Sequence, residues 1–362
     1  MSEHVAVTII TGFLGSGKTT LLNHLLQRPE LADSAVIINE FGEIGIDHLL
    51  VSAPAENMVL LDTGCLCCTV RGDLVQTLTD LYAKRADGTV PSFANVIIET
   101  TGLADPVPLL QTIVADPELS RAYRIHDVVT LVDALHGEAQ LDTHPESLKQ
   151  AAVADAMLIT KGDLAGPHAV DSLRERLHRV NPGAELHEAV RGAIDPTLFL
   201  RGSVYDLARK PSHVGSWLKE HAHGASEIDH HDHRDVNRHD AHIRAFCLYH
   251  DRPIRRAGLV MWLDMLANLR GANLLRVKAL LNVEGDPVVV HAVQTVVHEP
   301  VVLEAWPTDD RRSRLVFIGR DMAREEIERT FDAFDYAPAV TARKGIDPGA
   351  YAQFVEAMKG FR

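Results

Sequence analysis

Residues 12–20 have the sequence GFLGSGKTT, and the first eight match the pattern G-x-x-x-x-G-K-[ST]. A short β-branched, apolar run at 5–10 precedes the match, and a helix-forming segment at 19–27 follows it and ends before Pro29. In a turn between strand and helix, glycines let backbone N–H groups point at phosphate oxygens, and the helix N-terminus adds its positive dipole end. The pattern therefore predicts a loop that binds a nucleoside triphosphate, with a simple connecting turn as the alternative.

The side chains of this loop have separate expected roles. The Lys18 ammonium can reach the β- and γ-phosphates, and the Thr19 hydroxyl can ligate Mg²⁺. The other predicted nucleotide contacts of the loop are Gly12, Gly15, Ser16, Gly17 and Thr20.

A second motif follows an apolar run and fits [NT]-K-x-D: Thr160-Lys161-Gly162-Asp163. The Asp163 carboxylate can accept from guanine N1–H and from the exocyclic amino group, and the Lys161 stem can cover the base plane. Adenine does not offer that donor pair, so the motif favours GTP. An ordinary cap at the end of a strand is the alternative, because four residues are a weak signal.

Two further segments suit the γ-phosphate. Glu99 could orient water or the magnesium shell, and the N–H of Gly102 could reach the γ-phosphate, although Thr100 or Thr101 could instead cap a helix. Residues 38–47, INEFGEIGID, hold three carboxylates and two glycines. That composition is typical of a mobile switch that responds to the γ-phosphate, and also of a solvated loop.

The sequence GCLCC at 64–68 places Cys65, Cys67 and Cys68 within four residues. Thiolates favour zinc, with cobalt or copper(I) as alternatives, and three ligands leave one coordination position open for acquiring and releasing the metal. Buried core cysteines or a redox pair are the alternatives, although the spacing differs from Cys-x-x-Cys. The fourth cysteine, Cys247, stands alone in an apolar stretch and is expected in the core.

The elements that must position these residues indicate an α/β fold with a mostly parallel, doubly wound sheet. Short apolar runs alternate with helical patterns up to about residue 205. The expected strands are 5–10, 35–39, 58–61, 96–99, 128–132 and 157–159. Several end in polar residues, and ligands of such sheets bind beyond the carboxyl ends of the strands, so the candidate residues should meet at one edge.

Three segments make up the predicted domain organisation: a P-loop domain at 1–205, a linker at 206–242 and a smaller α+β domain at 243–362. The linker is rich in His and Asp between 221 and 242; it could load or buffer metal, act as a solvated spacer or be an expression tag, and we favour metal loading. For the last domain, the expected strands are 243–249, 275–283, 288–297 and 315–318, and the expected helices are 253–269, 323–334 and 348–358.

Composition narrows the class of protein further. An apolar fraction of 46% over 362 residues can fill the cores of about two domains. The net charge of −14 argues against nucleic acid or an anionic membrane as partner, because both need clustered Lys and Arg. No secretory signal pattern and no apolar run of ~18 residues occur, so we expect the cytoplasm.

Over nearly its whole length, the chain resembles the CobW-like metal-chaperone GTPases. The shared motifs are GFLGSGKTT (12–20), INEFGE (38–43), GCLCC (64–68), ETTGLADP (99–106) and TKGD (160–163), with a histidine-rich linker and a smaller C-terminal domain. The resemblance implies a cytoplasmic GTPase that delivers a metal, usually zinc and in some members cobalt or iron, to a client metalloprotein or a metal-dependent biosynthetic enzyme.

The resemblance also implies roles for single residues. Lys18 and Thr19 correspond to phosphate and magnesium contacts, Glu40 and Asp47 to switch residues and candidate magnesium ligands, Cys65, Cys67 and Cys68 to the metal motif, and Asp163 to the guanine reader. Two positions depart from the family pattern: Thr160 replaces the commoner Asn, which can loosen guanine selectivity, and Thr63 stands where many members have Asn.

These observations support the hypothesis of a GTP-hydrolysing zinc chaperone that uses GTP, Mg²⁺ and Zn²⁺, with Co²⁺ as an alternative cargo. Lys18, Glu40 and Glu99 are the expected catalytic residues. The alternatives are a cobalt- or iron-handling GTPase of the same family, a nucleotide-gated assembly factor with a structural metal, and a P-loop kinase. The client protein, the physiological metal and any homo-oligomer are open at this stage.

Overall fold

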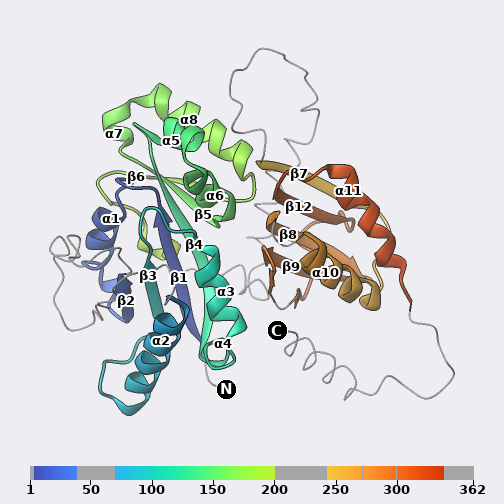
Figure 1. The fold of residues 1–362 in the computed structure, drawn as a ribbon, viewed down its shortest axis with the longest axis horizontal. Coiled ribbons are helices and arrows are strands. Elements are labelled where there is room, and N and C mark those ends of the chain that lie inside the picture. The colour runs from blue at the N-terminus through green and yellow to red at the C-terminus, as the bar shows by residue number, and fades with distance from the viewer. Residues whose placement is uncertain (1–3, 39–69, 200–242, 271–272, 299, 338–362) are drawn as a thin grey trace.

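A parallel sheet organises the first part of the computed structural model, which describes residues 4–38, 70–199, 243–270, 273–298 and 300–337 (Figure 1). Six parallel strands are found among the described residues up to 199, in the order β2-β3-β1-β4-β5-β6. The strands are β1 (Val5–Gly12), β2 (Ser34–Ile38), β3 (Asn95–Glu99), β4 (Tyr123–Asp133), β5 (Ala156–Thr160) and β6 (Glu185–Ala189). This order places β1 between β3 and β4, with β5 beside β4, so the loops that follow these four strands share one edge of the sheet.

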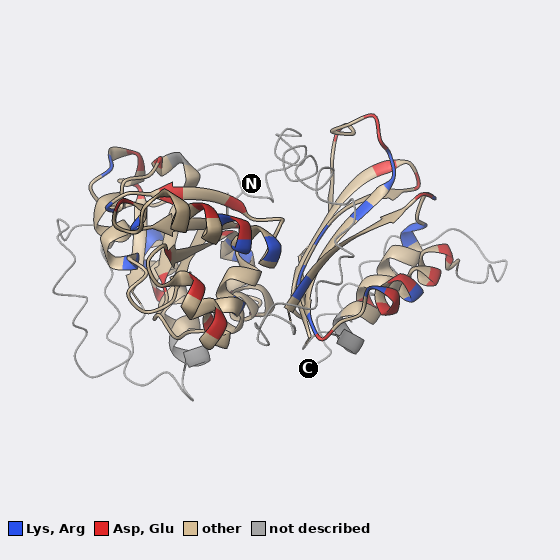
Figure 2. Cartoon of the chain, turned by 90° about the horizontal axis from the view of Figure 1, so that it is seen from above, with Lys and Arg blue, Asp and Glu red and all other residues tan. Residues whose placement is uncertain are grey.

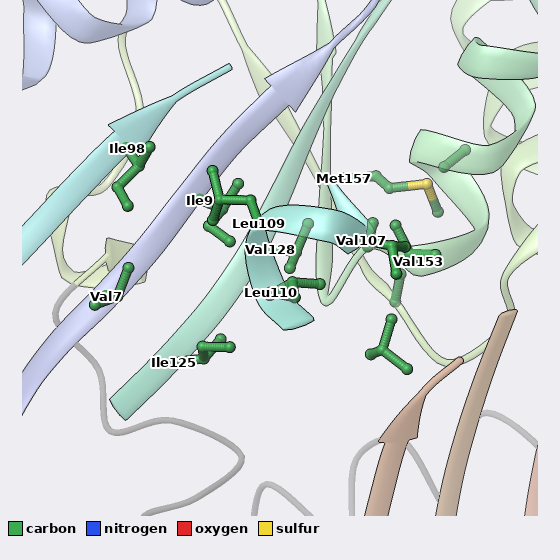
Figure 3. Close-up of a cluster of buried hydrophobic side chains, with 14 of the residues drawn as sticks. Val7, Ile9, Ile98, Val107, Leu109, Leu110, Ile125, Val128, Val153 and Met157 are labelled. Atoms are coloured by element: carbon green, nitrogen blue, oxygen red, sulfur yellow. The ribbon is translucent and has the colours of Figure 1, made fainter. Parts of the chain in front are cut away.

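Helices cover both faces of this sheet because its strands are apolar on both sides. They are α1 (Lys18–Leu25), α2 (Val70–Asp87), α3 (Val107–Ala115), α4 (Leu119–Ala122), α5 (Gly137–Thr143), α6 (Pro145–Val153), α7 (Gly162–Ala165) and α8 (Pro167–Val180), with 3-10 helices at Pro29–Leu31 and Pro196–Phe199. In β1, Ile10 packs with α1, whereas Ile9 packs with α3 on the opposite face. Figure 3 shows part of the apolar core on the α3 side of the sheet, in which Ile9 lies near Leu109 and Leu110.

An antiparallel sheet forms the second part of the chain, in the order β10-β9-β8-β12-β7, with β11 paired to β9. Its elements are β7 (Ile243–His250), α10 (Arg256–Arg270), β8 (Leu274–Val283), β9 (Asp286–Val293), β10 (Val296–Val297), β11 (Val301–Val302), β12 (Ser313–Arg320), α11 (Arg324–Glu328) and a 3-10 helix at Arg329–Asp335. On one face, α10 packs its buried Trp262 against Phe317 and Phe334. Figure 2 shows the other face of this sheet turned toward the first domain. Positively and negatively charged residues are interspersed over both domains.

Strand β8 shows how its sequence builds this two-sided sheet. Val277 and Ala279 point into the core under α10, and the intervening Arg276 and Lys278 point to the opposite face, as period-2 alternation requires. That face meets the first domain. Leu275 lies at a register shift between β8 and β12, where the alternation is interrupted, and it joins the apolar cluster that includes residues of α6 and α8. The two cationic side chains are therefore buried between the sheets.

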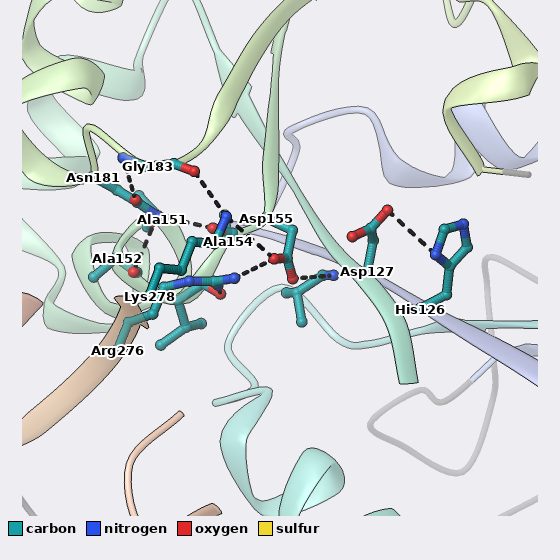
Figure 4. Close-up of polar contacts among 12 residues, drawn as sticks. His126, Asp127, Ala151, Ala152, Ala154, Asp155, Asn181, Gly183, Arg276 and Lys278 are labelled. Carbon is teal, nitrogen blue, oxygen red and sulfur yellow. Dashed lines mark hydrogen bonds and ion pairs between the residues drawn. The ribbon is translucent and has the colours of Figure 1, made fainter. Parts of the chain in front are cut away.

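Asp155, which precedes β5, forms ion pairs with both Arg276 and Lys278 (Figure 4). Arg276 binds its carboxylate and also donates to the carbonyl oxygen of Val153, while Lys278 Nζ lies 3.5 Å from the carboxylate and 2.8 Å from the carbonyl oxygen of Gly183. Burial by itself would raise the pKa of Asp155, but the two cations and the Val128 N–H hold that pKa below its ordinary value. The interface thus holds charges that are paired within the chain.

The pKa values of other ionisable groups at this interface are shifted in the direction that favours the uncharged form. Burial and the charge of Arg276 lower the pKa of Lys278 to about 8. Burial lowers the pKa of His298 to about 4, and burial with nearby Arg276 lowers the pKa of His291 well below its ordinary value. On the other side, burial and the charge of Asp155 raise the pKa of Asp127. These shifts follow from placing several ionisable groups in one largely buried contact.

Most expected elements are found, with differences at their ends. The helix expected at 19–27 is Lys18–Leu25, and the strand expected at 128–132 begins earlier, at Tyr123. Strand β6 was not predicted, because Glu185–Ala189 has no apolar run and mostly half-buried or exposed side chains. The predicted strands at 35–39, 96–99 and 157–159 correspond to β2, β3 and β5.

In the second domain, two expectations need correction. The strand expected at 288–297 is divided into β9 and β10, because the chain turns at Gln294, whose φ is +52°. The helix expected at 323–334 is α-helical only over Arg324–Glu328 and continues as a 3-10 helix. The strand expected at 58–61, the linker and the helix expected at 348–358 lie outside the described residues.

Candidate nucleotide site

The loop after β1 has a backbone that requires its glycines. Gly12, Gly15 and Gly17 have φ values of +139°, +74° and +96°, a region that side chains with a Cβ rarely adopt. A Cβ on Gly12 would also lie 2.4 Å from the carbonyl oxygen of Leu131. The conformation of the loop is therefore encoded locally by the glycine spacing.

Lys18, the first residue of α1, folds its side chain back into this loop. Its Nζ donates to the carbonyl oxygens of Gly12, at 2.9 Å, and Phe13, at 3.2 Å, so a buried ammonium is held within the turn. No side chain caps α1, whose N-cap residue is Gly17. The first-turn N–H groups and the ammonium therefore face the same loop, an arrangement that suits an anion.

Two buried hydroxyl groups near the loop could bind a nucleotide and its magnesium ion. The hydroxyl oxygens of Ser16 and Thr101 are buried and have no hydrogen-bond partner within the described part of the chain. Buried hydroxyls are normally satisfied, so these two can take phosphate or ion-bound water. Thr19, which follows the loop lysine, is half-buried, and Thr20 is exposed.

The segment after β3 lies directly against the loop. Thr100 donates its N–H to the carbonyl oxygen of Ile10 and its hydroxyl to the hydroxyl oxygen of Thr11, while a Cβ on Gly102 would lie 2.6 Å from Leu14 N. Glu99, 4% exposed, ends β3 at the same edge. The structure thus places Glu99 and Gly102 beside the P-loop.

Neither Thr100 nor Thr101 caps the following helix. Helix α3 begins at Val107 after Pro106, and the Val107 N–H donates to the carboxylate of Asp105. The capping alternative is therefore wrong for this segment.

The TKGD motif borders the same loop from β5. Thr160 donates its hydroxyl to the carbonyl oxygen of Ser16 at 2.7 Å, and Lys161, at φ +58°, donates Nζ to Asp133 Oδ2 at 2.7 Å. Asp163 lies in α7 and pairs with Arg191 at 3.6 Å. The motif is thus joined to the P-loop by one residue, Thr160, and its Asp163 remains at the surface.

Asp133 is a functional candidate that motif reading missed, and Arg191 is the exposed ion-pair partner of Asp163. Burial alone would raise the pKa of Asp133, but hydrogen bonds from Lys161 and the Leu135 N–H lower it below the ordinary value. The carboxylate can therefore hold the Lys161 stem in place for a base. Its only signal in the sequence was a polar residue at the carboxyl end of an apolar strand, and Arg191 had none.

Several predicted site residues lie outside the described residues: Glu40, Asp47, Cys65, Cys67 and Cys68. Within the described ranges, no group of three or more His, Cys, Asp or Glu side chains could hold a metal ion. No helix in those ranges is both long and apolar enough to span a membrane. Cys247, expected in the core, is half-buried and packs against a small cluster of buried side chains.

The all-parallel sheet, the loop glycines and the buried lysine define a P-loop nucleotide-binding protein. Residues 6–188 match the family described as CobW/HypB/UreG, nucleotide-binding domain, and residues 243–335 match the cobalamin synthesis protein cobW C-terminal domain. The chain belongs to the CobW family.

Relatives and a solved structure agree with this assignment over most of the chain. The chain is 32% identical over 329 residues to zinc chaperone YjiA of Escherichia coli, covering 90% of this chain and 98% of that one. It is 31% identical to zinc chaperone CobW of Pseudomonas aeruginosa, covering 89% of each. The crystal structure of Zn(II)-bound YjiA GTPase from E. coli superposes with a TM-score of 0.65 at 26% identity, covering 92% of this chain and all of that chain.

Proposed function

We propose that this CobW-family GTPase is a zinc chaperone that binds Zn²⁺ through Cys65, Cys67 and Cys68 and delivers it to a client metalloprotein in a nucleotide-dependent cycle. The observation that carries the proposal is the close packing of the P-loop against the Gly102 segment, in a chain whose near full-length relatives are named zinc chaperones. The cysteine motif supplies soft ligands of the kind that zinc favours.

The described residues support GTP hydrolysis at this edge. Lys18 would move from the carbonyl oxygens of Gly12 and Phe13 to the β- and γ-phosphates, and the Gly102 N–H would face the γ-phosphate. Glu99 would orient the attacking water. Asp163 would accept from guanine, with Lys161 held over the base by Asp133.

Magnesium would be held by Thr19, with Glu40 and Asp47 as further candidate ligands; when bound, it neutralises charge on the phosphates. Ser16 and Thr101 provide nearby buried hydroxyls that fit the phosphates and the ion's water shell. Glu40 is also proposed to act in hydrolysis, as a switch residue.

The cysteines lie between the 38–47 segment and β3 in sequence, so metal and γ-phosphate could bias the same segments. Coupling between two ligands is reciprocal: if GTP tightens zinc binding by some factor, zinc tightens GTP binding by that factor. We place this cycle in the cytoplasm, with residues 221–242 as a weak metal-loading tract.

The test is a zinc titration against a competing chelator in the presence of GTPγS with Mg²⁺, of GDP, and without nucleotide. A coupling of about 1–3 kcal/mol predicts that GTPγS tightens zinc binding roughly 5- to 150-fold. The matched control replaces all three cysteines by serine, which should keep GTPγS binding and remove its zinc dependence.

Equal zinc affinity in all three nucleotide states would contradict the transfer cycle and favour the assembly factor with a structural metal. Release of inorganic phosphate from GTP without a second substrate separates hydrolysis from a kinase reaction.

A further inference from the structure

Helix α6 contacts both loops of the proposed γ-phosphate site. Its N-cap residue, His144, stacks on Phe13 of the P-loop with ring centroids 4.4 Å apart. Five and six residues further along, Lys149 and Gln150 reach the segment that begins at Gly102. None of the three belongs to a nucleotide-binding motif.

Gln150 makes the central contact of this arrangement. Its side chain is 1% exposed, and its Nε2 donates to the carbonyl oxygens of Gly102, at 3.2 Å, and Ala104, at 2.9 Å. The Lys149 ammonium binds the carboxylate of Asp105 in the same segment. Three points of the segment 102–105 are therefore held from one helix.

The amide of Gln150 is costly to bury, which argues that its contacts matter. Its Oε1 is buried with no hydrogen-bond partner within the described part of the chain, so only the donor half of the amide is satisfied. An apolar side chain of similar length would avoid that cost while filling the same space. The donor half, and with it the position of the two carbonyl groups, is what distinguishes Gln150 from such a side chain.

The helix is fixed independently of the segment it holds. Thr130 of β4 donates its hydroxyl to the carbonyl oxygen of Gln150, and the Asn181 amide donates to the carbonyl oxygens of Ala151, Ala152 and Ala154. On its other side, Gly102 abuts Leu14 of the P-loop, so the segment lies between a fixed helix and the phosphate loop.

We propose that Gln150 is a positioning residue for GTP hydrolysis, which holds the backbone at Gly102 through its carbonyl group so that the Gly102 N–H meets the γ-phosphate. The inference rests on the proposed function, because it requires Gly102 to contact that phosphate. GDP lacks the γ-phosphate, so loss of Gln150 should affect GTP and spare GDP.

The experiment compares Gln150→Met with Asn282→Leu. Each replaces a buried amide that donates to a backbone carbonyl group with an apolar side chain of similar length, and Asn282 lies in β8 of the second domain, where it donates to the carbonyl oxygen of Arg311. A displaced contact lowers turnover steeply, so Gln150→Met should lower kcat about tenfold or more and weaken GTPγS binding, with the Kd for GDP within about twofold of wild type. Asn282→Leu should lower the melting temperature at least as far and keep kcat within about twofold.

Wild-type kcat in Gln150→Met, or an equal loss of kcat in Asn282→Leu, would overturn the proposal. If Gln150→Met does not fold, Lys149→Met tests the same segment from a half-exposed position. It should lower kcat about two- to threefold with unchanged GDP binding, and wild-type kcat there would also overturn the proposal. A wild-type protein that releases no phosphate from GTP would refute the proposed function itself.

Discussion

Two buried aspartates, one at the end of β4 and one just before β5, differ in how accessible their cationic partners are. Asp133 lies at the carboxyl end of β4 and pairs with Lys161, whose side chain is one-third exposed. Asp155 lies before the amino end of β5 and pairs with two buried cations from the other domain. The first pair leaves a cation accessible to a ligand, whereas the second is closed within the chain.

The comparison teaches that burial and charge alone do not identify a site. Both carboxyl groups have pKa values below the ordinary range, because cations or N–H donors outweigh burial at each. The difference lies in the surroundings: the phosphate edge also holds the buried hydroxyls of Ser16 and Thr101, which have no hydrogen-bond partner among the described residues, whereas the cations beside Asp155 also donate to backbone carbonyl oxygens. Variants at the two regions should therefore separate turnover from stability.

The largest expected effect is on turnover, from Lys18→Ala. Removing the ammonium eliminates a charge that would face the β- and γ-phosphates, so kcat/KM for GTP should fall at least about 100-fold. The melting temperature should change little, because the lost bonds are to loop carbonyl groups. Phosphate-release kinetics and thermal unfolding measure the two effects, and turnover equal to wild type would refute the assignment.

Next is Asp155→Asn, which leaves Arg276 and Lys278 without their carboxylate. Breaking a buried pair from one side costs about 3–5 kcal/mol in the free energy of unfolding, measurable by urea titration. Nucleotide affinity of the folded variant should match wild type. The control Asp286→Asn breaks an exposed pair with Arg256, worth at most about 1 kcal/mol. Lost nucleotide binding in folded Asp155→Asn would show that the two regions are not separable.

The interface should also weaken in mild acid. Burial lowers the pKa of His298 from 6.5 to about 4, so between these values the unfolded chain binds more protons than the folded one. Stability is therefore retained above pH 6.5 and lost as pH falls toward 4, with about 2 kcal/mol lost by pH 5 from His298 alone. Urea titrations at pH 7 and 5 measure the loss. His298→Phe should reduce it, and an unchanged pH dependence would contradict the explanation.

The smallest effect is expected from Arg191→Ala. The ion pair between Arg191 and Asp163 joins a largely exposed side chain to the surface carboxylate at 3.6 Å, and such pairs contribute about 0–1 kcal/mol. The Kd for GTP should change by less than about threefold, as measured by fluorescence titration. A tenfold or larger change would move Arg191 into the base site and sharpen the contrast between the two regions.

The sequence determined the parts of the fold and site that depend on neighbouring residues. The loop glycines need positive φ values, and the lysine that follows them reaches back only a few residues, so local spacing was enough to predict the P-loop. The buried strands were predictable because continuous apolar runs bury both faces. Strand β6 was not, because its side chains are mostly half-buried or exposed and its pairing with β5 is not visible in the sequence.

Only the tertiary structure decided which distant polar residues meet. Gln150 reaches a carbonyl group 48 residues earlier in the chain, and Arg276 meets a carboxylate 121 residues away. In the sequence, Arg276 and Lys278 are charges that interrupt an apolar strand, and nothing nearby reveals that they face another domain. Hydrophobic burial sets the alternation along each strand, but the packing of one domain against the other selects the partner for each buried charge.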